Sequence, residues 1–154
     1  MCIIVPYNNI MGYDSEGGEL LFFKSLNEQN YSNYRVLLID DGSVDHSTEY
    51  VMEKLSSYPR LSNRVQILKN KKHMGLLASM DIAIRNYCES GEIVFKIDIE
   101  DALIGKQALN LLNRFYKNTT VWFSYTNYAF LSNKVSSYAK NPVTSSAEIH
   151  SGFN

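Results

Sequence analysis

The chain alternates between short apolar runs and longer segments in which apolar residues recur at wider spacing. Mainly apolar runs at residues 3–6, 34–39 and 92–97 predict strands that are covered on both faces. At residues 64–68 apolar and polar positions alternate, which predicts a strand at a more exposed edge of a sheet. A fifth strand is predicted at residues 120–125.

Between these strands, apolar side chains recur at helical spacing. The helices predicted from this spacing cover residues 19–28, 47–57, 77–88 and 106–116. Ser47 and Thr48 are suitable N-cap residues for the second helix, and Pro59 is expected to end it. Gly91 is placed to end the third helix. The residues expected to face the core are Leu77, Met80, Ile84 and Cys88 in the third helix and Leu109, Leu112 and Phe115 in the fourth.

Strands that alternate with helices predict an α/β fold, Rossmann-like, with a mostly parallel sheet and helices on both faces. Right-handed crossovers then bring every loop that follows a strand to the same edge of the sheet. These loops contain Tyr7 and residues 40–45, 69–75 and 98–101. Open α/β sheets bind their ligands at this edge, so we expect a binding crevice there.

Carboxylates follow two of the predicted strands directly. The second strand ends in Asp40-Asp41-Gly42-Ser43, and the fourth ends in Asp98-Ile99-Glu100-Asp101. Two acidic strand ends suggest a site for a nucleotide and a divalent cation, because such cations bridge carboxylates to phosphates. The alternative is that Asp-Gly-Ser is an ordinary turn and capping sequence. The first motif alone would favour that alternative, whereas the two acidic ends together favour a binding site.

Composition narrows the class of protein. The 154 residues suffice for one domain with a core, and 45% hydrophobic and 20% charged residues exclude a disordered chain. A net charge of -1 gives no electrostatic basis for a nucleic-acid partner. No apolar run approaches the roughly 18–20 residues of a membrane segment. Residues 1–6 read as a strand and not as a signal peptide.

Cys2 and Cys88 are too few for a disulfide framework, and both lie in apolar segments. We therefore expect them to be small buried hydrophobic residues, and we expect a reducing compartment. The corresponding location is the cytoplasm or the cytoplasmic face of a membrane.

Several familiar site motifs are missing from the sequence. There is no dinucleotide-binding G-x-G-x-x-G after the first strand, no P-loop and no G-x-S-x-G nucleophile elbow. His46, His73 and His150 are not at zinc-ligand spacing, and each is interpreted as a solvated loop histidine. A phospho-acceptor domain fits poorly, because the acidic pair follows the second strand and not the first.

Four segments resemble the N-terminal half of family 2 glycosyltransferases of the GT-A fold, over roughly residues 2–126. They are CIIVPYNN, LLFFKSLNEQNYSNYRVLLIDDGSVDHSTEYV, NKKHMG and SGEIVFKIDIEDAL. The second matches the family's strand ending in Asp-Asp-Gly-Ser-x-Asp, and the fourth matches the strand ending in a D-x-D motif. Each segment alone is weak evidence, but four in the right order are unlike a chance match.

The resemblance implies a domain, residues 1–131, that binds a nucleotide-diphosphate sugar, most simply a UDP-sugar. The nucleotide-binding residues it implies are Pro6, Tyr7, Asp40, Asp41, Gly75 and Asp98. Tyr7 would lie against the base, and Asp41 would accept a hydrogen bond from the base ring, with Asp40 as a substitute. Mn2+ or Mg2+ would be held by Asp98, Glu100 and Asp101. The activity implied is transfer of the sugar, with inversion, to the hydroxyl of an unknown acceptor that an Asp or Glu base deprotonates.

Three departures from the family pattern leave an alternative open. Glu100 stands where the second Asp of the metal motif is usual, and Met80-Asp81 stands where Arg-Asn is common. The half that binds the acceptor is not recognisable, because residues 132–154 are an irregular Ser/Asn-rich tail or the start of that region. The alternative is a catalytically degenerate GT-A-like domain that acts as a structural or assembly subunit.

Overall fold

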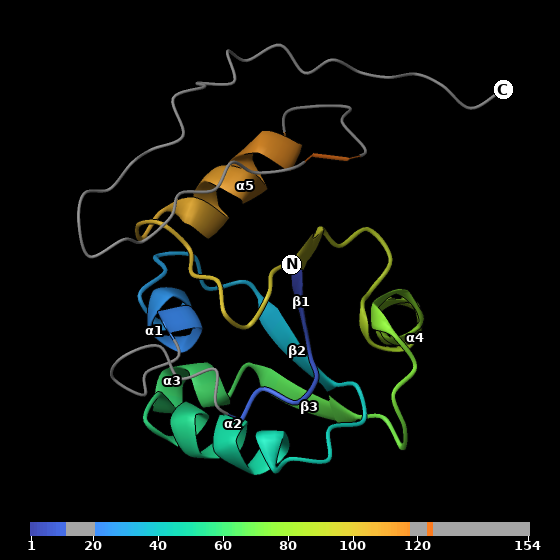
Figure 1. Cartoon of the computed structure of the whole chain (residues 1–154). Coiled ribbons are helices and arrows are strands. Elements are labelled where there is room, and N and C mark those ends of the chain that lie inside the picture. The colour runs from blue at the N-terminus through green and yellow to red at the C-terminus, as the bar shows by residue number, and fades with distance from the viewer. Residues whose placement is uncertain (12–20, 118–122, 125–154) are drawn as a thin grey trace, which may run out of the picture. The chain divides into compact units, whose positions relative to one another are not determined.

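The structure is a computed structural model that describes residues 1–11, 21–117 and 123–124 (Figure 1). The chain divides into two compact units, Met1–Lys117 and Asn118–Asn154, and all helices and strands discussed below belong to the first. The predicted fifth strand lies outside the described residues, apart from Phe123 and Ser124. The predicted boundary after residue 131 and the tail at 132–154 also lie outside them and stay predictions.

A sheet of four parallel strands forms the centre of the first unit. The strands are β1 (Cys2–Tyr7), β2 (Arg35–Asp40), β3 (Val65–Lys69) and β4 (Val94–Lys96). Their order is β3-β2-β1-β4, and every neighbouring pair is parallel. The prediction of a parallel α/β sheet is therefore confirmed, as is the exposed edge position of β3.

Helices cover both faces of the sheet, as predicted (Figure 1). They are α1 (Leu21–Asn27), α2 (Ser47–Ser56), α3 (Pro59–Ser62), α4 (Leu76–Tyr87) and α5 (Ala108–Lys117). Because side chains of a strand alternate between faces, Ile3 and Val5 pack in the core that contains α1, α2 and α3. Cys2 and Ile4 point the other way and pack in the core that contains α4.

Two details of the helices differ from the prediction. Pro59 does not simply follow α2 but begins α3, because proline is tolerated in a first helical turn, where no backbone N–H is needed. In α4 and at its end, Met80, Ile84 and Cys88 pack partly buried against the core as predicted, but Leu77 is 80% exposed. The fully buried residues of this helix are the small Ser79 and Ala83. Small side chains at the contact allow α4 to approach the sheet closely.

The ends of α4 and α5 differ as well. Helix α4 ends at Tyr87 with Cys88 already extended, three residues before Gly91. In α5, Leu109 is buried and Leu112 packs against the core as predicted, but Phe115 is 41% exposed.

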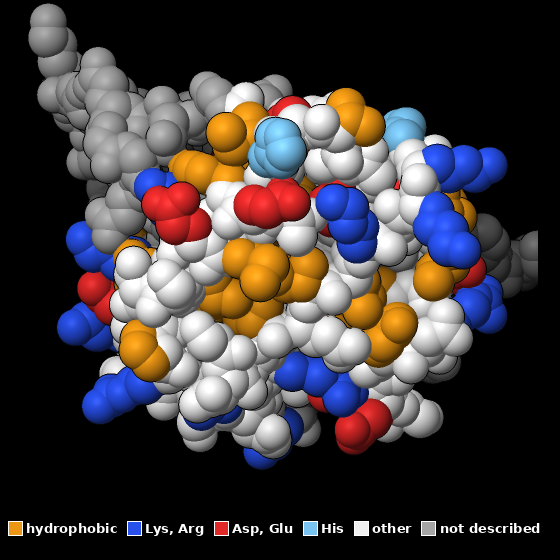
Figure 2. Space-filling view, turned by 90° about the horizontal axis from the view of Figure 1, so that it is seen from below, with side chains coloured by type: hydrophobic (Ala, Val, Ile, Leu, Met, Phe, Trp, Pro, Cys, Tyr) orange, Lys and Arg blue, Asp and Glu red, His pale blue; other side chains and the backbone are white. Residues whose placement is uncertain are grey.

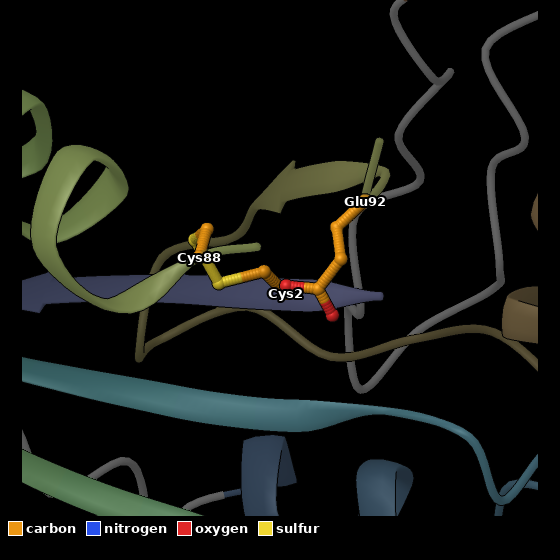
Figure 3. A group of neighbouring side chains, drawn as sticks. All are labelled: Cys2, Cys88 and Glu92. Atoms are coloured by element: carbon orange, nitrogen blue, oxygen red, sulfur yellow. A yellow bond between two sulfur atoms is a disulfide. The ribbon is translucent and has the colours of Figure 1, made fainter. Parts of the chain in front are cut away.

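The two cysteines form a disulfide, which corrects the expectation that they are unpaired. Cys2 lies in β1 and Cys88 directly follows α4, so the fold brings together two residues 86 positions apart (Figure 3). Both face the same layer between the sheet and α4. The inference of a reducing compartment loses its premise, because it rested on free cysteines.

Glu92 lies beside this disulfide (Figure 3). Its carboxylate is already used, since it accepts bonds from the Arg35 guanidinium, the Met1 amine and the backbone N–H of Glu89. These contacts outweigh the burial of Glu92 and lower the pKa of its carboxyl. The cluster therefore joins the start of β1, the start of β2 and the loop before β4.

Within the described part of the chain, no helix is both long enough and apolar enough to cross a bilayer.

Candidate functional site

The strand order reverses at β1, and this reversal indicates where a ligand site is expected. The chain steps from β1 to β2 to β3 on one side of the sheet and returns to β4 on the other side of β1. In open parallel sheets a ligand binds outside the carboxyl ends of the strands at such a switch point. The loops after β1 and β4 flank this position, and the loops after β2 and β3 lie alongside.

The face toward which β1 runs in Figure 1 is seen directly in Figure 2. Histidine, acidic and basic side chains gather there beside an apolar area (Figure 2).

The loop after β1 is fastened to the turn after β2. Asn8 Nδ2 donates to the carbonyl of Asp41 at 2.8 Å. The Asn9 N–H donates to Ser43 Oγ at 2.9 Å, and its side-chain oxygen accepts from the Val44 N–H at 3.0 Å. The next two backbone N–H groups donate to side chains farther along, Ile10 to Ser47 at the start of α2 and Met11 to Asp45 of the turn. The Asp-Asp-Gly-Ser-x-Asp sequence thus shapes two loops at once.

Asp40 is fully buried and stabilises the turn from inside. It accepts from the Ser43 N–H at 2.7 Å and from the Thr48 hydroxyl, and the Lys69 ammonium lies 3.5 Å away. Burial opposes ionisation, but these contacts outweigh it and lower the pKa of the Asp40 carboxyl. Asp40 is therefore a turn residue here, as the turn interpretation proposed, and its oxygens are not open to a ligand.

Asp41 is 4% exposed and holds the turn that joins β3 to α4. Its Oδ1 accepts from Asn70 Nδ2 at 2.8 Å, the Met74 N–H at 2.9 Å and the Ser79 hydroxyl at 2.7 Å. Its Oδ2 accepts from the Gly75 N–H at 2.8 Å. Burial alone would raise the pKa of Asp41, but these donors lower it to about 2.

Oδ2 of Asp41 has a second neighbour, the Nδ1 atom of His73, at 2.9 Å. His73 is therefore not the purely solvated loop residue that the sequence predicted. Asn70 and Ser79 are likewise contacts that sequence reasoning did not identify. The one available signal was the polar run before Gly75, which contains both Asn70 and His73.

Two glycines make the junction of these turns sterically feasible. A Cβ on Gly42, which has φ +74°, would lie 2.4 Å from the backbone of Lys72 and of His73. The two turns therefore pack backbone to backbone. Gly75 has φ +89°, a conformation that favours glycine, and it directs its N–H to Asp41 at the start of α4.

The ring of Tyr7 is not at the crevice surface, which corrects the expectation that it lies against a base. Tyr7 continues the face of Ile3 and Val5, is 4% exposed and belongs to the core. Its hydroxyl lies beside Thr48 without a hydrogen bond of regular geometry to any described residue, and burial raises its pKa. The part that reaches the site is its carbonyl, which accepts from the Asp41 N–H at 2.9 Å. Pro6 is buried in the strand before it.

The acidic turn after β4 is open by comparison. Ile97 and Ile99 are buried and anchor it, whereas Glu100 and Asp101 are exposed and Asp98 is partly buried. The Asp101 N–H donates to the Asp98 carbonyl at 3.1 Å, and the Lys96 ammonium contacts Asp98 Oδ2.

The predicted metal ligands Asp98, Glu100 and Asp101 do not bring their carboxylate oxygens within 4.8 Å of one another, and their role as ligands stays a prediction. Among the described residues, the one group of three such side chains with ligand atoms within 4.8 Å is Cys2, Cys88 and Glu92. Its sulfur atoms are bonded to each other and cannot act as thiolate ligands. The β4 turn still fits a hard cation held by one or two carboxylates and by phosphate.

Met80-Asp81, the second departure from the family pattern, lies on the helix and not in the crevice loops. Asp81 forms an exposed ion pair with Arg85, with oxygens 2.8 Å and 2.9 Å from Nε. This is an ordinary i, i+4 pair on a helix surface.

Comparison with known proteins identifies the family to which this chain belongs. Residues 16–140 match the family described as Glycosyl transferase family 2. An uncharacterized glycosyltransferase of Rickettsia felis is 26% identical over 151 residues, which is 98% of this chain and 21% of that protein. The chain spans from 14% to 46% of the length of the curated relatives it matches.

Solved structures show the same fold. The mannosyltransferase PcManGT of Pyrobaculum calidifontis, in complex with GDP-Man and Mn2+, aligns with a TM-score of 0.63 at 20% identity, over 78% of this chain and 33% of that one. TarS of S. aureus in complex with UDP aligns with a TM-score of 0.57 at 22% identity, over 75% of this chain and 31% of that one. The fold is thus the Rossmann-like α/β fold of GT-A glycosyltransferases.

Proposed function

Because the chain belongs to Glycosyl transferase family 2, we propose that it is the donor-binding part of a glycosyltransferase. The donor is a nucleotide-diphosphate sugar, most simply a UDP-sugar. The sugar passes to an acceptor hydroxyl with inversion at the anomeric carbon. Two structural relatives contain GDP-Man with Mn2+ and UDP, which supports a nucleotide donor.

The observation that carries the proposal is the open acidic turn after β4, placed next to the switch point of the sheet. Asp98, Glu100 and Asp101 carry three negative charges within four residues, and two of these side chains are exposed. A diphosphate would be repelled by this turn unless a cation lay between them. The turn is therefore suited to Mn2+ or Mg2+ bound together with a diphosphate.

Different residues of the chain would bind the base and the cation. Asp41 accepts a hydrogen bond from the base ring, and the main chain around Pro6 and Tyr7 lines the base side of the crevice. Gly75 fixes the turn before α4 by donating its N–H to Asp41. Asp98, with Glu100 or Asp101, holds the cation. When bound, the cation stabilises the negative charge of the departing nucleoside diphosphate.

A second candidate is a domain of the same family that binds a nucleotide without turnover. Two observations favour it: the three carboxylates do not converge, and the Lys96 ammonium occupies an oxygen of Asp98. Both candidates predict that the chain binds a nucleotide. Only the first predicts turnover, measured as transfer of the sugar or as hydrolysis of a UDP-sugar.

The test is a thermal shift measurement with UDP and GDP, each with and without Mn2+. We expect UDP with Mn2+ to raise the melting temperature, Asp98→Asn to remove the part that depends on Mn2+, and Asp41→Ala to abolish the shift. Asp81→Ala is the control, because Asp81 is exposed and paired only on the surface of α4. The absence of a shift with either nucleotide, with or without metal, would contradict donor binding and favour a structural subunit.

A further inference from the structure

We propose that Lys96 is a phosphate-binding residue, whose ammonium contacts the diphosphate of the nucleotide beside the acidic turn after β4. The inference rests on the proposed function, because it takes a nucleoside diphosphate as the ligand. It deepens that function by giving the site a positive charge of its own. Part of the affinity for the nucleotide then does not depend on Mn2+ or Mg2+.

Lys96 lies at the switch point of the sheet. It is the last residue of β4, and it pairs with Ile4 of the neighbouring parallel strand β1. Its side chain therefore leaves the sheet on the face of Ile4, which packs in the core that contains α4. Among the described residues of that core, none comes from β4. The side chain of Lys96 is accordingly 34% exposed, which leaves it accessible to a ligand.

The ammonium of Lys96 is directed toward the acidic turn. It contacts Oδ2 of Asp98, which lies beyond the end of the strand, at the edge where a ligand is expected. An ammonium has three N–H donors, and Asp98 is the one acceptor recorded for this ammonium within the described residues. An ion pair between side chains as exposed as these adds little to the stability of the fold. The remaining donors are available to a second anion.

The charges of the turn give this ammonium a role in binding. Asp98, Glu100 and Asp101 together repel a diphosphate. Their carboxylate oxygens do not come within 4.8 Å of one another, so the three do not form a ready-made site for a metal ion. Lys96 offsets the charge of Asp98. It also offers phosphate oxygens the charge-assisted hydrogen bonds that lysine forms in phosphate sites.

The shared carboxylate predicts how Lys96 and a divalent cation affect each other. Both would use Asp98, so they are alternatives at this side chain. In the absence of metal, the ammonium stays on Asp98 and contacts the diphosphate. In the presence of Mn2+, Asp98 is shared with the ion and Lys96 contributes less. Removal of the Lys96 charge should therefore weaken UDP binding mainly in the absence of metal, which a purely structural ion pair would not explain.

The experiment measures UDP affinity by calorimetry, once in EDTA and once in Mn2+. The proteins are the full wild-type chain, the neutral variants Lys96→Met and Lys96→Gln, the charge-conserving variant Lys96→Arg and the control Lys106→Met. Lys106 is an exposed lysine farther along the loop after β4, so it tests for general attraction of an anion. The melting temperature of each ligand-free protein verifies folding. We expect little change, because Lys96 and its partner Asp98 are both partly exposed.

In EDTA we expect both neutral variants to lower UDP affinity by about fivefold. Lys96→Arg and Lys106→Met should stay within about twofold of wild type, because the first keeps a charged donor and the second leaves Lys96 in place. In Mn2+ the loss caused by Lys96→Met should be smaller than in EDTA.

Unchanged UDP affinity of the neutral variants in EDTA overturns the role of Lys96 and leaves the proposed function standing. Wild-type binding that occurs only in Mn2+ has the same consequence. An equal loss for Lys106→Met also overturns it, because the effect would then be one of surface charge alone. Absence of UDP binding in every protein under both conditions overturns the proposed function together with the role of Lys96.

Discussion

The two acidic strand ends look alike in the sequence and differ in the structure. At the end of β2, Asp40 and Asp41 are buried and their oxygens are occupied by backbone and side-chain donors. At the end of β4, Glu100 and Asp101 are exposed, and the contact recorded on the Asp98 carboxylate is a flexible lysine. A carboxylate whose lone pairs are filled by its own protein positions loops, whereas one with free oxygens is available to a cation.

The family motif at the end of β2 is therefore first a device for assembling the site. Its residues fasten the loop after β1, the turn after β2 and the turn before α4 to one another. The proposed recognition of a base by Asp41 would be added to this structural role.

The largest expected effect concerns the close contact of the two turns at the β2 end. Gly42→Ala places a Cβ 2.4 Å from the backbone of Lys72 and His73 and also requires a positive φ. We expect a loss of about 3 kcal/mol in the free energy of unfolding, measured by urea denaturation.

The matched control for this change is Gly105→Ala in the loop after β4. Gly105 also has a positive φ, +76°, but a Cβ there would meet no atom within 4 Å. It should cost about 1 kcal/mol, from backbone conformation alone. Equal losses at the two glycines would show that the turn-to-turn contact is not tight.

A smaller effect is expected from the charge of Asp41. Its pKa is lower in the folded chain than in the unfolded chain, so its stabilising contribution is complete above about pH 4 and is lost as the pH falls toward about 2. This amounts to about 2 kcal/mol. Acid unfolding of Asp41→Asn should lack this component. Identical curves for wild type and Asp41→Asn would contradict the assigned role.

The smallest expected effect concerns the β4 end and its lysine. Lys96→Met removes the ammonium from Asp98 Oδ2, and both side chains are about a third or more exposed, so screening limits the gain. We expect about a two- to fivefold increase in Mn2+ affinity in the presence of UDP, measured by calorimetry. The control, Lys106→Met, removes an exposed lysine farther along the same loop. A decrease in Mn2+ affinity would show that Lys96 supports the site and does not compete with the cation.

Patterns that depend on neighbours in the sequence predicted the fold correctly. Apolar periodicity separated strands from helices, and the rule for parallel crossovers then placed Asp41 and Asp98 at the same edge of the sheet. The direction of Tyr7 could also have been predicted, because it shares the face of Ile3 and Val5. Because all residues of β1 are buried, its sequence does not show which face of the strand points toward which layer of helices.

What could not be predicted depends on contacts between distant residues. Asp41 is satisfied by Ser79, 38 positions away, and Cys2 meets Cys88, 86 positions away. Neither contact leaves a periodic signal in the sequence. Asp40 and Asp98 both follow a strand in the sequence, but they differ in the number of donors that surround them. These donors come from distant residues, so the sequence does not show the difference.

The Cys2–Cys88 disulfide places the two acidic strand ends in different parts of the covalent chain: Asp40 and Asp41 lie inside the loop that it closes, and Asp98 lies outside it. It closes a ring of chain that contains β2, β3 and α4 and excludes β4 with its acidic turn. A single proteolytic cut anywhere between the two cysteines leaves both fragments linked until a reductant is added. A cut after Cys88 releases the β4 end as a separate piece. The proposed base side of the site is thus carried by a cyclic segment, and the proposed cation side by a linear one.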